Sequence, residues 1–319
     1  MTSKRPGTVD APDDATSTAA AEGSTPVIWL LPVVSLLWLG VELWAARGQI
    51  HTSGGGTVAL ATAADALPGV VEATIVAGIG LALLVATSIA RTAAPALRWI
   101  ASGLAGAVIG GLAAWLVASA YPHLPSIGAI AATLIVAGAI GGVLVPVPRV
   151  RAAIAGGLAA SIAALAVITV VNSNAVLSRM LRLYGAGTSA ASWVDASKLV
   201  QYTQYAVAGI VAGLVAFTYL RRSEVRQFPI YLLAGVVPGF LLLVGFGLTE
   251  IGGHHLLSAA NALSEADRII NGMESAETVP NALLLLFLGA FTALIAFGRT
   301  LKPAAAATPP KAPTQRAGE

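Results

Sequence analysis

Eight long apolar stretches most constrain what this chain can fold into. Each is roughly 17–25 residues long, which is the length a helix needs to cross a hydrocarbon core about 30 Å thick. The 319 residues are 56% hydrophobic and only 10% charged, whereas soluble domains carry about 25% charged residues. The sequence therefore predicts an all-α polytopic membrane bundle embedded in a lipid bilayer. The predicted spans cover residues 27–46, 70–90, 100–120, 127–147, 152–171, 200–220, 229–248 and 280–297.

Basic residues predict how the bundle is oriented. Lys and Arg close to span ends are retained in the cytoplasm. If both termini are cytoplasmic, most of the 18 Lys and Arg residues fall inside, many of them in short loops such as PRVR and RRSEVRQF. We expect a disordered tail over 1–25, a transmembrane domain over 26–299 and a second tail over 300–319. The Ala-, Val- and Gly-rich composition suggests a GC-rich bacterium and hence its cytoplasmic membrane.

Two of the longer outer connections have apolar residues at helical spacing. Leu177, Met180, Leu181 and Tyr184 form one stripe, which is typical of an amphipathic helix lying on a membrane surface. A similar stripe runs over 259–270, and we expect Asn271-Gly272 to end it. The simplest interpretation is that these helices cover the outer ends of the bundle.

Four of the predicted spans contain the pattern Gly-x-x-x-Gly. Glycines four residues apart share one helix face, so a second helix can approach closely there. The pattern indicates tight packing within one protein, and it also leaves open partner membrane helices. The pairs are Gly106 with Gly110, Gly138 with Gly142, Gly209 with Gly213, and Gly235 with Gly239.

The segment GVVPGF puts a proline near the middle of the seventh predicted span. Pro238 removes one helix hydrogen bond, and Gly235 and Gly239 lower the resistance to bending. A broken span is a recognised indication of a transport site. The simpler alternative is a fixed kink that helps packing. We therefore predict that these three residues contribute to a solute site.

A second predicted site lies in TEIGGHHLLS, directly after the seventh span. Glu250 and His254 are four residues apart and share a face if the helix continues, so they are able to hold a proton or a metal ion. Glu42 and Glu72 are expected near the outer ends of the first two spans. Together they predict an outer rim of substrate-binding carboxylates and histidines. Two glycines interrupt the segment, so a solvated loop is the alternative, and a metal site stays undecided.

Several classes of function are disfavoured by what the sequence lacks. There are no cysteines and no phosphate-binding Gly-x-x-x-x-Gly-Lys, Gly-x-Ser-x-Gly or His-Glu-x-x-His pattern. The sequence has no basic stripe interleaved with aromatic residues, so nucleic acid is not an expected partner. No cofactor is expected. The absence of acidic or histidine residues in the middle of the predicted spans argues against a proton-coupled carrier of the usual kind.

The function predicted from these features is permease-like transport of a small or amphipathic solute. The alternative is a non-catalytic membrane subunit or scaffold of an envelope complex. A third choice is an envelope lipid or glycan transferase, with Glu265 and Asp267 as metal-chelating carboxylates. Ser264 with Asp267 fits a capping box equally well, so an enzyme is the weaker prediction.

Overall fold

The fold is known from a computed structural model, which describes residues 27–52, 56–89, 94–121, 127–147, 150–187, 189–225, 227–254, 258 and 265–300. Nearly all of the two predicted tails lies outside the described residues. The described residues form helices and turns and contain no strand, so the all-α fold class is confirmed. The helices are α1 (Val27–Thr52), α2 (Gly56–Ile89), α3 (Pro95–Ala120), α4 (Ile127–Val143), α5 (Arg151–Asn172), α6 (Asn174–Leu183), α7 (Ala190–Arg222), α8 (Phe228–Gly252) and α10 (Glu265–Gly298).

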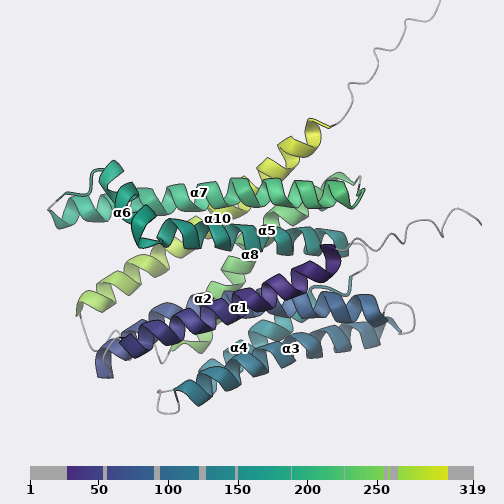
Figure 1. Cartoon of the computed structure of the whole chain (residues 1–319), viewed down its shortest axis with the longest axis horizontal. Coiled ribbons are helices and arrows are strands. Elements are labelled where there is room, and N and C mark those ends of the chain that lie inside the picture. Colours follow the sequence, from purple (N-terminus) through teal and green to yellow (C-terminus); the bar gives the residue numbers. More distant parts are fainter. Residues whose placement is uncertain are drawn as a thin grey trace, which may run out of the picture.

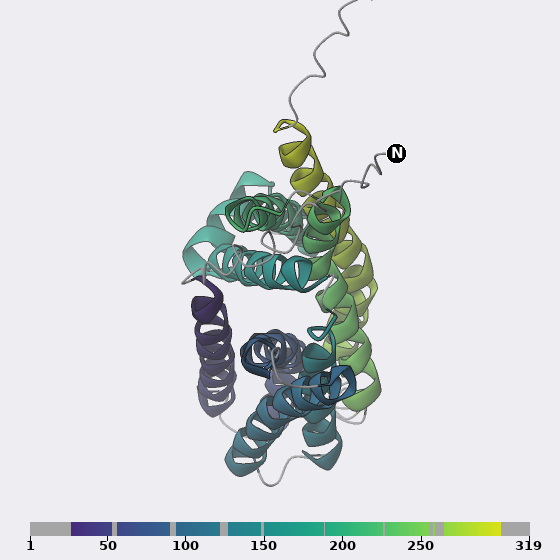
Figure 2. The same cartoon turned by 90° about the vertical axis from the view of Figure 1, so that its right-hand side faces the viewer.

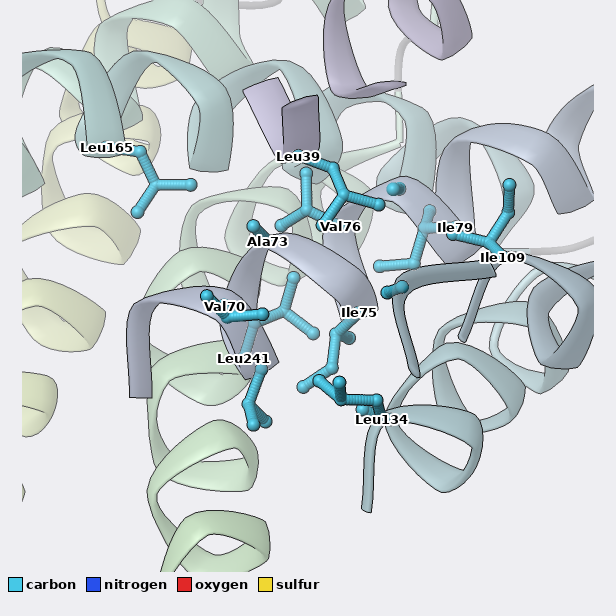
Figure 3. Packing of buried hydrophobic residues seen from close by; sticks show 14 of the residues in the cluster. Leu39, Val70, Ala73, Ile75, Val76, Ile79, Ile109, Leu134, Leu165 and Leu241 are labelled. Atoms are coloured by element: carbon cyan, nitrogen blue, oxygen red, sulfur yellow. The ribbon is translucent and has the colours of Figure 1, made fainter. Parts of the chain in front are cut away.

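Helix α2 is the central helix of the fold. Every residue from Val70 to Gly80 is buried, which is the pattern of a helix that is apolar all round and covered by protein on all sides. Figure 3 shows its side chains among Leu39 of α1, Leu134 of α4 and Leu241 of α8. Helix α2 therefore organises the helices around it.

The bundle has two halves joined by α8. In the N-terminal half, α1, α3 and α4 contact α2. In the C-terminal half, α5 and α10 each pack on α7 and on α8. Figures 1 and 2 show α1 to α4 on one side of the bundle, α5 to α7 on the other, and α8 with α10 along one flank. Helix α8 also contacts α2 and α4, so it is the main link between the halves.

The two ends of the bundle differ in charge. The start of α1 and the end of α10 lie together at the right of Figure 1. We call this the basic end, because the described arginines that begin α3 and α5 or end α7 and α10 gather there. The other end, where α1 ends and α2 begins, is called the opposite end. The arginines of the basic end are Arg98, Arg151, Arg221, Arg222 and Arg299.

Seven of the described helices are long and apolar enough to cross a membrane, which fits a multi-pass membrane protein. Helix α4 is apolar but has only 17 residues. The bounds of α3, α5 and α8 are close to those of the predicted spans. Helices α1, α2, α7 and α10 extend well beyond their predicted spans at the opposite end. Their polar residues continue the helices past the apolar runs from which the spans were predicted.

Two local predictions about helix ends are wrong. Pro280 was expected to begin a helix, but it lies inside α10, which begins at Glu265. Asn271-Gly272 lies in the same continuous helix and does not end it. Proline and glycine are tolerated inside membrane helices because neighbouring groups can satisfy the freed backbone atoms. The helix predicted around Leu177 is confirmed as α6, which has no buried residue.

The glycine pairs of the predicted motifs all lie at contacts between helices of this chain. Gly106 and Gly138 lie against each other between α3 and α4. In the C-terminal half, a Cβ atom added to Gly213 of α7 or to Gly235 of α8 would lie 2.5 Å from the carbonyl oxygen of Gly289 in α10. Three helices therefore meet at Gly289, and their backbones approach as closely as glycine permits.

Candidate functional site at the opposite end of the N-terminal half

A cavity of about 410 Å³ lies between α1, α2, α3 and α4 at the opposite end. Its volume falls in the range of about 300–1,000 Å³ that is usual for small-molecule sites. Several lining residues of α1, α2 and α3 are alanines, whose small side chains do not fill the space between the helices. The lining residues are Leu43, Trp44, Ala46, Arg47, Ala63, Ala66, Leu67, Val70, Leu116, Val117, Ser119, Ala120, Tyr121, Ile130 and Leu134.

The polar groups of the cavity come from the ends of α1 and α3. Arg47 is the one charged residue among the described residues that line it. Burial raises the pKa of the Tyr121 phenol, and the nearby positive charge of Arg47 opposes that rise. The Ser119 hydroxyl donates to the carbonyl oxygen of Leu116 at 2.9 Å. An apolar cavity with a guanidinium and hydroxyls at its end is complementary to an amphiphile whose head group is anionic.

Two carboxylates lie on the helices that form the cavity, although neither lines it. Glu42 directly precedes the lining residue Leu43 in α1, and Glu72 follows Val70 by two residues in α2. The charges of the two glutamates interact. Within the described part of the chain, neither carboxylate forms a salt bridge or a hydrogen bond. Ionisable residues inside membrane proteins commonly mark substrate or ion pathways.

Glu72 lies deeper than the sequence predicted. It was expected two residues inside its span, but α2 begins at Gly56, which makes Glu72 the seventeenth of 34 residues. The side chain is buried at 9% exposure. Its Cβ atom lies 3.7 Å from the Cβ position of Gly245 in α8, and Oε2 of Glu42 lies 3.5 Å from that of Gly69. Glu42 of α1 therefore packs against Gly69 of α2, and Glu72 of α2 packs against Gly245 of α8.

The other predicted site residues are not gathered at this cavity. Glu250 and His254 are both exposed at the end of α8, while Thr249 next to them is buried. The helix continues through Gly252, so the predicted interruption begins only at Gly253. No group of three potential metal ligands occurs among the described residues. The side chains of the remaining three histidines lie outside the described part.

The GVVPGF segment lies in the C-terminal half. Helix α8 is continuous across Pro238, which is buried. A Cβ atom on Gly235 would lie 2.5 Å from the Gly289 carbonyl oxygen, and one on Gly239 would lie 2.5 Å from that of Ala282. Both glycines therefore contact α10. The structure brings Glu42 and Glu72 together and places this segment at a helix interface.

Sequence reasoning missed the contribution of Arg47 and Tyr121. One sign was available in the sequence. Arg47 directly follows an apolar span and is one of the few basic residues that the predicted orientation puts on the outer side of the membrane. No protein family model, no curated protein and no solved structure matches this chain. The functional argument therefore rests on the geometry of this site.

Proposed function

We propose that this protein is a permease for an anionic amphiphile in a bacterial cytoplasmic membrane. In this proposal α4 is an eighth span, both termini are cytoplasmic, and the basic end faces the cytoplasm because short arginine-containing loops are retained there. A helix of 17 residues is at the lower limit of the length that crosses a hydrocarbon core. The cavity at the opposite end then faces the outside.

The cavity between α1 and α4 is the observation that carries the proposal. Its walls are alanine, leucine, valine and isoleucine, which suit a hydrocarbon chain. Arg47 and Tyr121 at the end of the cavity supply donors for an anionic head group. A solute bound there lies next to Glu42 and Glu72, along the length of the central helix.

The glutamate pair supplies a coupling site in the same proposal. Two carboxylates close together in a medium of low dielectric constant repel each other, so a cation beside them is favoured. Entry of a proton or a sodium ion is thereby linked to the packing of α2 against α1 and α8. The sequence argued against such coupling because Glu72 was placed near a span end, whereas its position at the seventeenth of the 34 residues of α2 supports a deeper location.

A flipping assay in proteoliposomes tests the proposal. The probe is lysophosphatidylglycerol carrying an NBD fluorophore on its chain, added to both leaflets, and dithionite bleaches only the outer leaflet. The protein is expected to raise the bleached fraction above that of empty liposomes. Ala66→Trp fills the cavity and should abolish this rise, whereas Ala132→Trp, at an exposed position of α4 outside the cavity, should preserve it.

Two results would contradict the proposal. One is a wild-type protein that leaves the bleached fraction unchanged with every cation gradient applied. The other is equal flipping by the cavity variant and its control, which would place the route elsewhere. Arg47→Gln adds a head-group test, because it should reduce flipping of the anionic probe more than flipping of an NBD-labelled lysophosphatidylcholine.

Cysteine labelling tests the proposed orientation separately. A cysteine at Ser189, before α7, should react with a membrane-impermeant maleimide in intact cells. A cysteine at Ser223, directly after α7, should react only after the cells are opened. The reverse pattern at both positions would overturn the orientation without touching the cavity.

A membrane subunit or scaffold is the second candidate, and one face of α1 favours it. Gly40 has no atom within 4 Å of its Cβ position, and it lies in an apolar groove with Val33, Leu37 and Trp44. A partner helix would fit there, although lipid also covers such a face. The Gly-x-x-x-Gly pairs, by contrast, are occupied within the chain. Stoichiometric copurification that is lost in Gly40→Leu would favour this candidate.

A further inference from the structure

A second groove lies at the basic end, between α7 and α10. Its volume is about 450 Å³. It is formed by different helices from the cavity of the proposed solute site and lies at the other end of the bundle. Two arginines lie at one end of the groove. Apolar residues line most of the rest of it along both helices. The residues that matter are Leu214, Phe217 and Arg221 of α7, together with Ile295, Arg299 and Thr300 at the end of α10.

The two arginines of the groove come from different helices. Both are exposed, and no described carboxylate forms a salt bridge with either. The guanidinium carbon of Arg221 lies 5.8 Å from the centre of the Phe217 ring. Such a cation–π contact holds the guanidinium over the ring and limits its rotamers. Two positive charges therefore meet at one groove without an acidic partner among the described residues.

The groove continues from these charges into apolar surface. Leu214 is seven residues before Arg221, a distance of about 10 Å along a helix. On α10, Ile295 is one turn before Arg299, and both apolar side chains are exposed. The groove therefore combines two arginines at one end with exposed apolar side chains along α7 and α10.

Aromatic packing beneath the groove makes its base rigid. The rings of Tyr231 and Phe297 lie 4.5 Å apart, and the rings of Phe217 and Tyr231 lie 5.9 Å apart. The Tyr231 hydroxyl donates to the carbonyl oxygen of Val225 at 2.7 Å. These contacts connect α7, α8 and α10 next to the groove.

We propose that this groove binds an anionic phospholipid of the leaflet at the basic end. The phosphate accepts hydrogen bonds from the Arg221 and Arg299 guanidinium groups, which match phosphate geometry well. One acyl chain lies along Leu214 and Ile295. Basic sites between membrane helices on the cytoplasmic side are known to bind anionic head groups. The proposal is independent of the solute route, because the two sites share no residue.

Native mass spectrometry of the purified protein tests it. Phosphatidylglycerol and phosphatidylcholine with the same acyl chains are titrated separately, and the first bound lipid is quantified. The wild type should bind phosphatidylglycerol about tenfold more tightly, because both lipids offer a phosphate but the choline cation of phosphatidylcholine is repelled by the two arginines, which offsets about one charge-assisted contact. Arg221→Gln should remove most of this preference, and the double variant with Arg299→Gln should remove all of it.

Arg222→Gln is the matched control, because it removes the neighbouring charge at the same end but does not line the groove. It should retain the preference. Equal losses in Arg221→Gln and Arg222→Gln would show that only net charge matters and would overturn the proposal. Tight binding of inorganic phosphate that displaces the lipid would overturn it as well. If the double variant elutes as an aggregate, Arg299→Gln alone, beyond the end of α10, gives the decisive comparison.

Discussion

The two halves of the bundle pack with different side chains. Buried residues of the C-terminal half are mostly alanines, while glycines make the closest helix contacts in both halves. The core around α2 uses larger leucine, isoleucine and valine side chains. Small residues at a helix contact bring two backbones together, so the difference between the halves lies in the buried side chains and not in how closely the helices approach. The cavity, the buried Glu72 and the partly buried Glu42 all occur in the N-terminal half, so under the proposed function this half handles the solute and the C-terminal half supports it.

The largest effect is expected where three helices meet in the C-terminal half. Gly235→Leu would place a Cβ atom 2.5 Å from the Gly289 carbonyl oxygen, and a backbone atom cannot move aside as a side chain can. Overpacking of this kind costs about 1–3 kcal/mol or more. The melting temperature in detergent should fall by roughly 5–10 °C, or no folded protein should be recovered.

Gly247→Leu is the control for this variant. It lies in the same helix, and nothing lies within 4 Å of its Cβ position. Its melting temperature should stay close to that of the wild type. Similar losses in both variants would mean that α8 tolerates no large side chain anywhere, and the contrast between the halves would lose its basis.

The next largest effect concerns the carboxylates of the N-terminal half. Glu72→Gln keeps the size of the side chain but removes its charge, so the fold should persist while cation coupling fails. Flipping of the NBD-labelled lipid driven by a cation gradient should fall by at least about tenfold, a difference of about 1.4 kcal/mol. Flipping without a gradient should change less. A variant that responds to the gradient like the wild type would remove Glu72 from the coupling step.

Much of the fold could be predicted from sequence because uninterrupted apolar runs end at basic loops. Helices α3, α5 and α8 illustrate this. The extent of α2 could not be predicted, because Pro68-Gly69 resembles a break between a loop and a span. In the structure both residues lie within α2. The sequence did contain a sign of this continuity. Ala63, Leu67 and Val70 are apolar at helical spacing across the proline, and all three are buried.

The candidate site was harder to predict than the fold. Glu42 and Glu72 are rare charged residues in apolar runs, so the sequence alone identifies them as candidates. The depth of Glu72 along its helix depends on where α2 begins, which the sequence did not show. The cavity depends on which helices meet at the opposite end. Alanines such as Ala46 and Ala66 look like ordinary helix residues until the neighbouring helices are known. Sequence therefore indicates which residues are chemically unusual, and only packing shows where space remains.

A smaller effect is expected for the proline of the seventh predicted span. Pro238 is buried in a continuous helix, between Gly235 and Gly239, which both contact α10. Pro238→Ala restores one donor, and its neighbours already fit the present helix path, so flipping should stay within about twofold of the wild type. A severalfold loss with unchanged melting temperature would instead support a hinge in α8 and move the solute route toward the C-terminal half.

The smallest effect is expected at the opposite end of the C-terminal half. A polar contact between α7 and α10 lies there. Glu277 of α10 accepts a hydrogen bond from the Tyr202 hydroxyl at 2.9 Å and lies 3.7 Å from the Lys198 ammonium group.

Solvent-exposed ion pairs contribute only about 0–1 kcal/mol. Glu277→Gln should therefore lower the melting temperature by no more than about 1–4 °C, and added salt should weaken the wild type toward the variant. Flipping should be unchanged, which also makes this variant the charge-matched control for Glu72→Gln. If Glu277→Gln reduced flipping as strongly as Glu72→Gln, loss of any carboxylate would be sufficient, and solute handling could no longer be assigned to the N-terminal half alone.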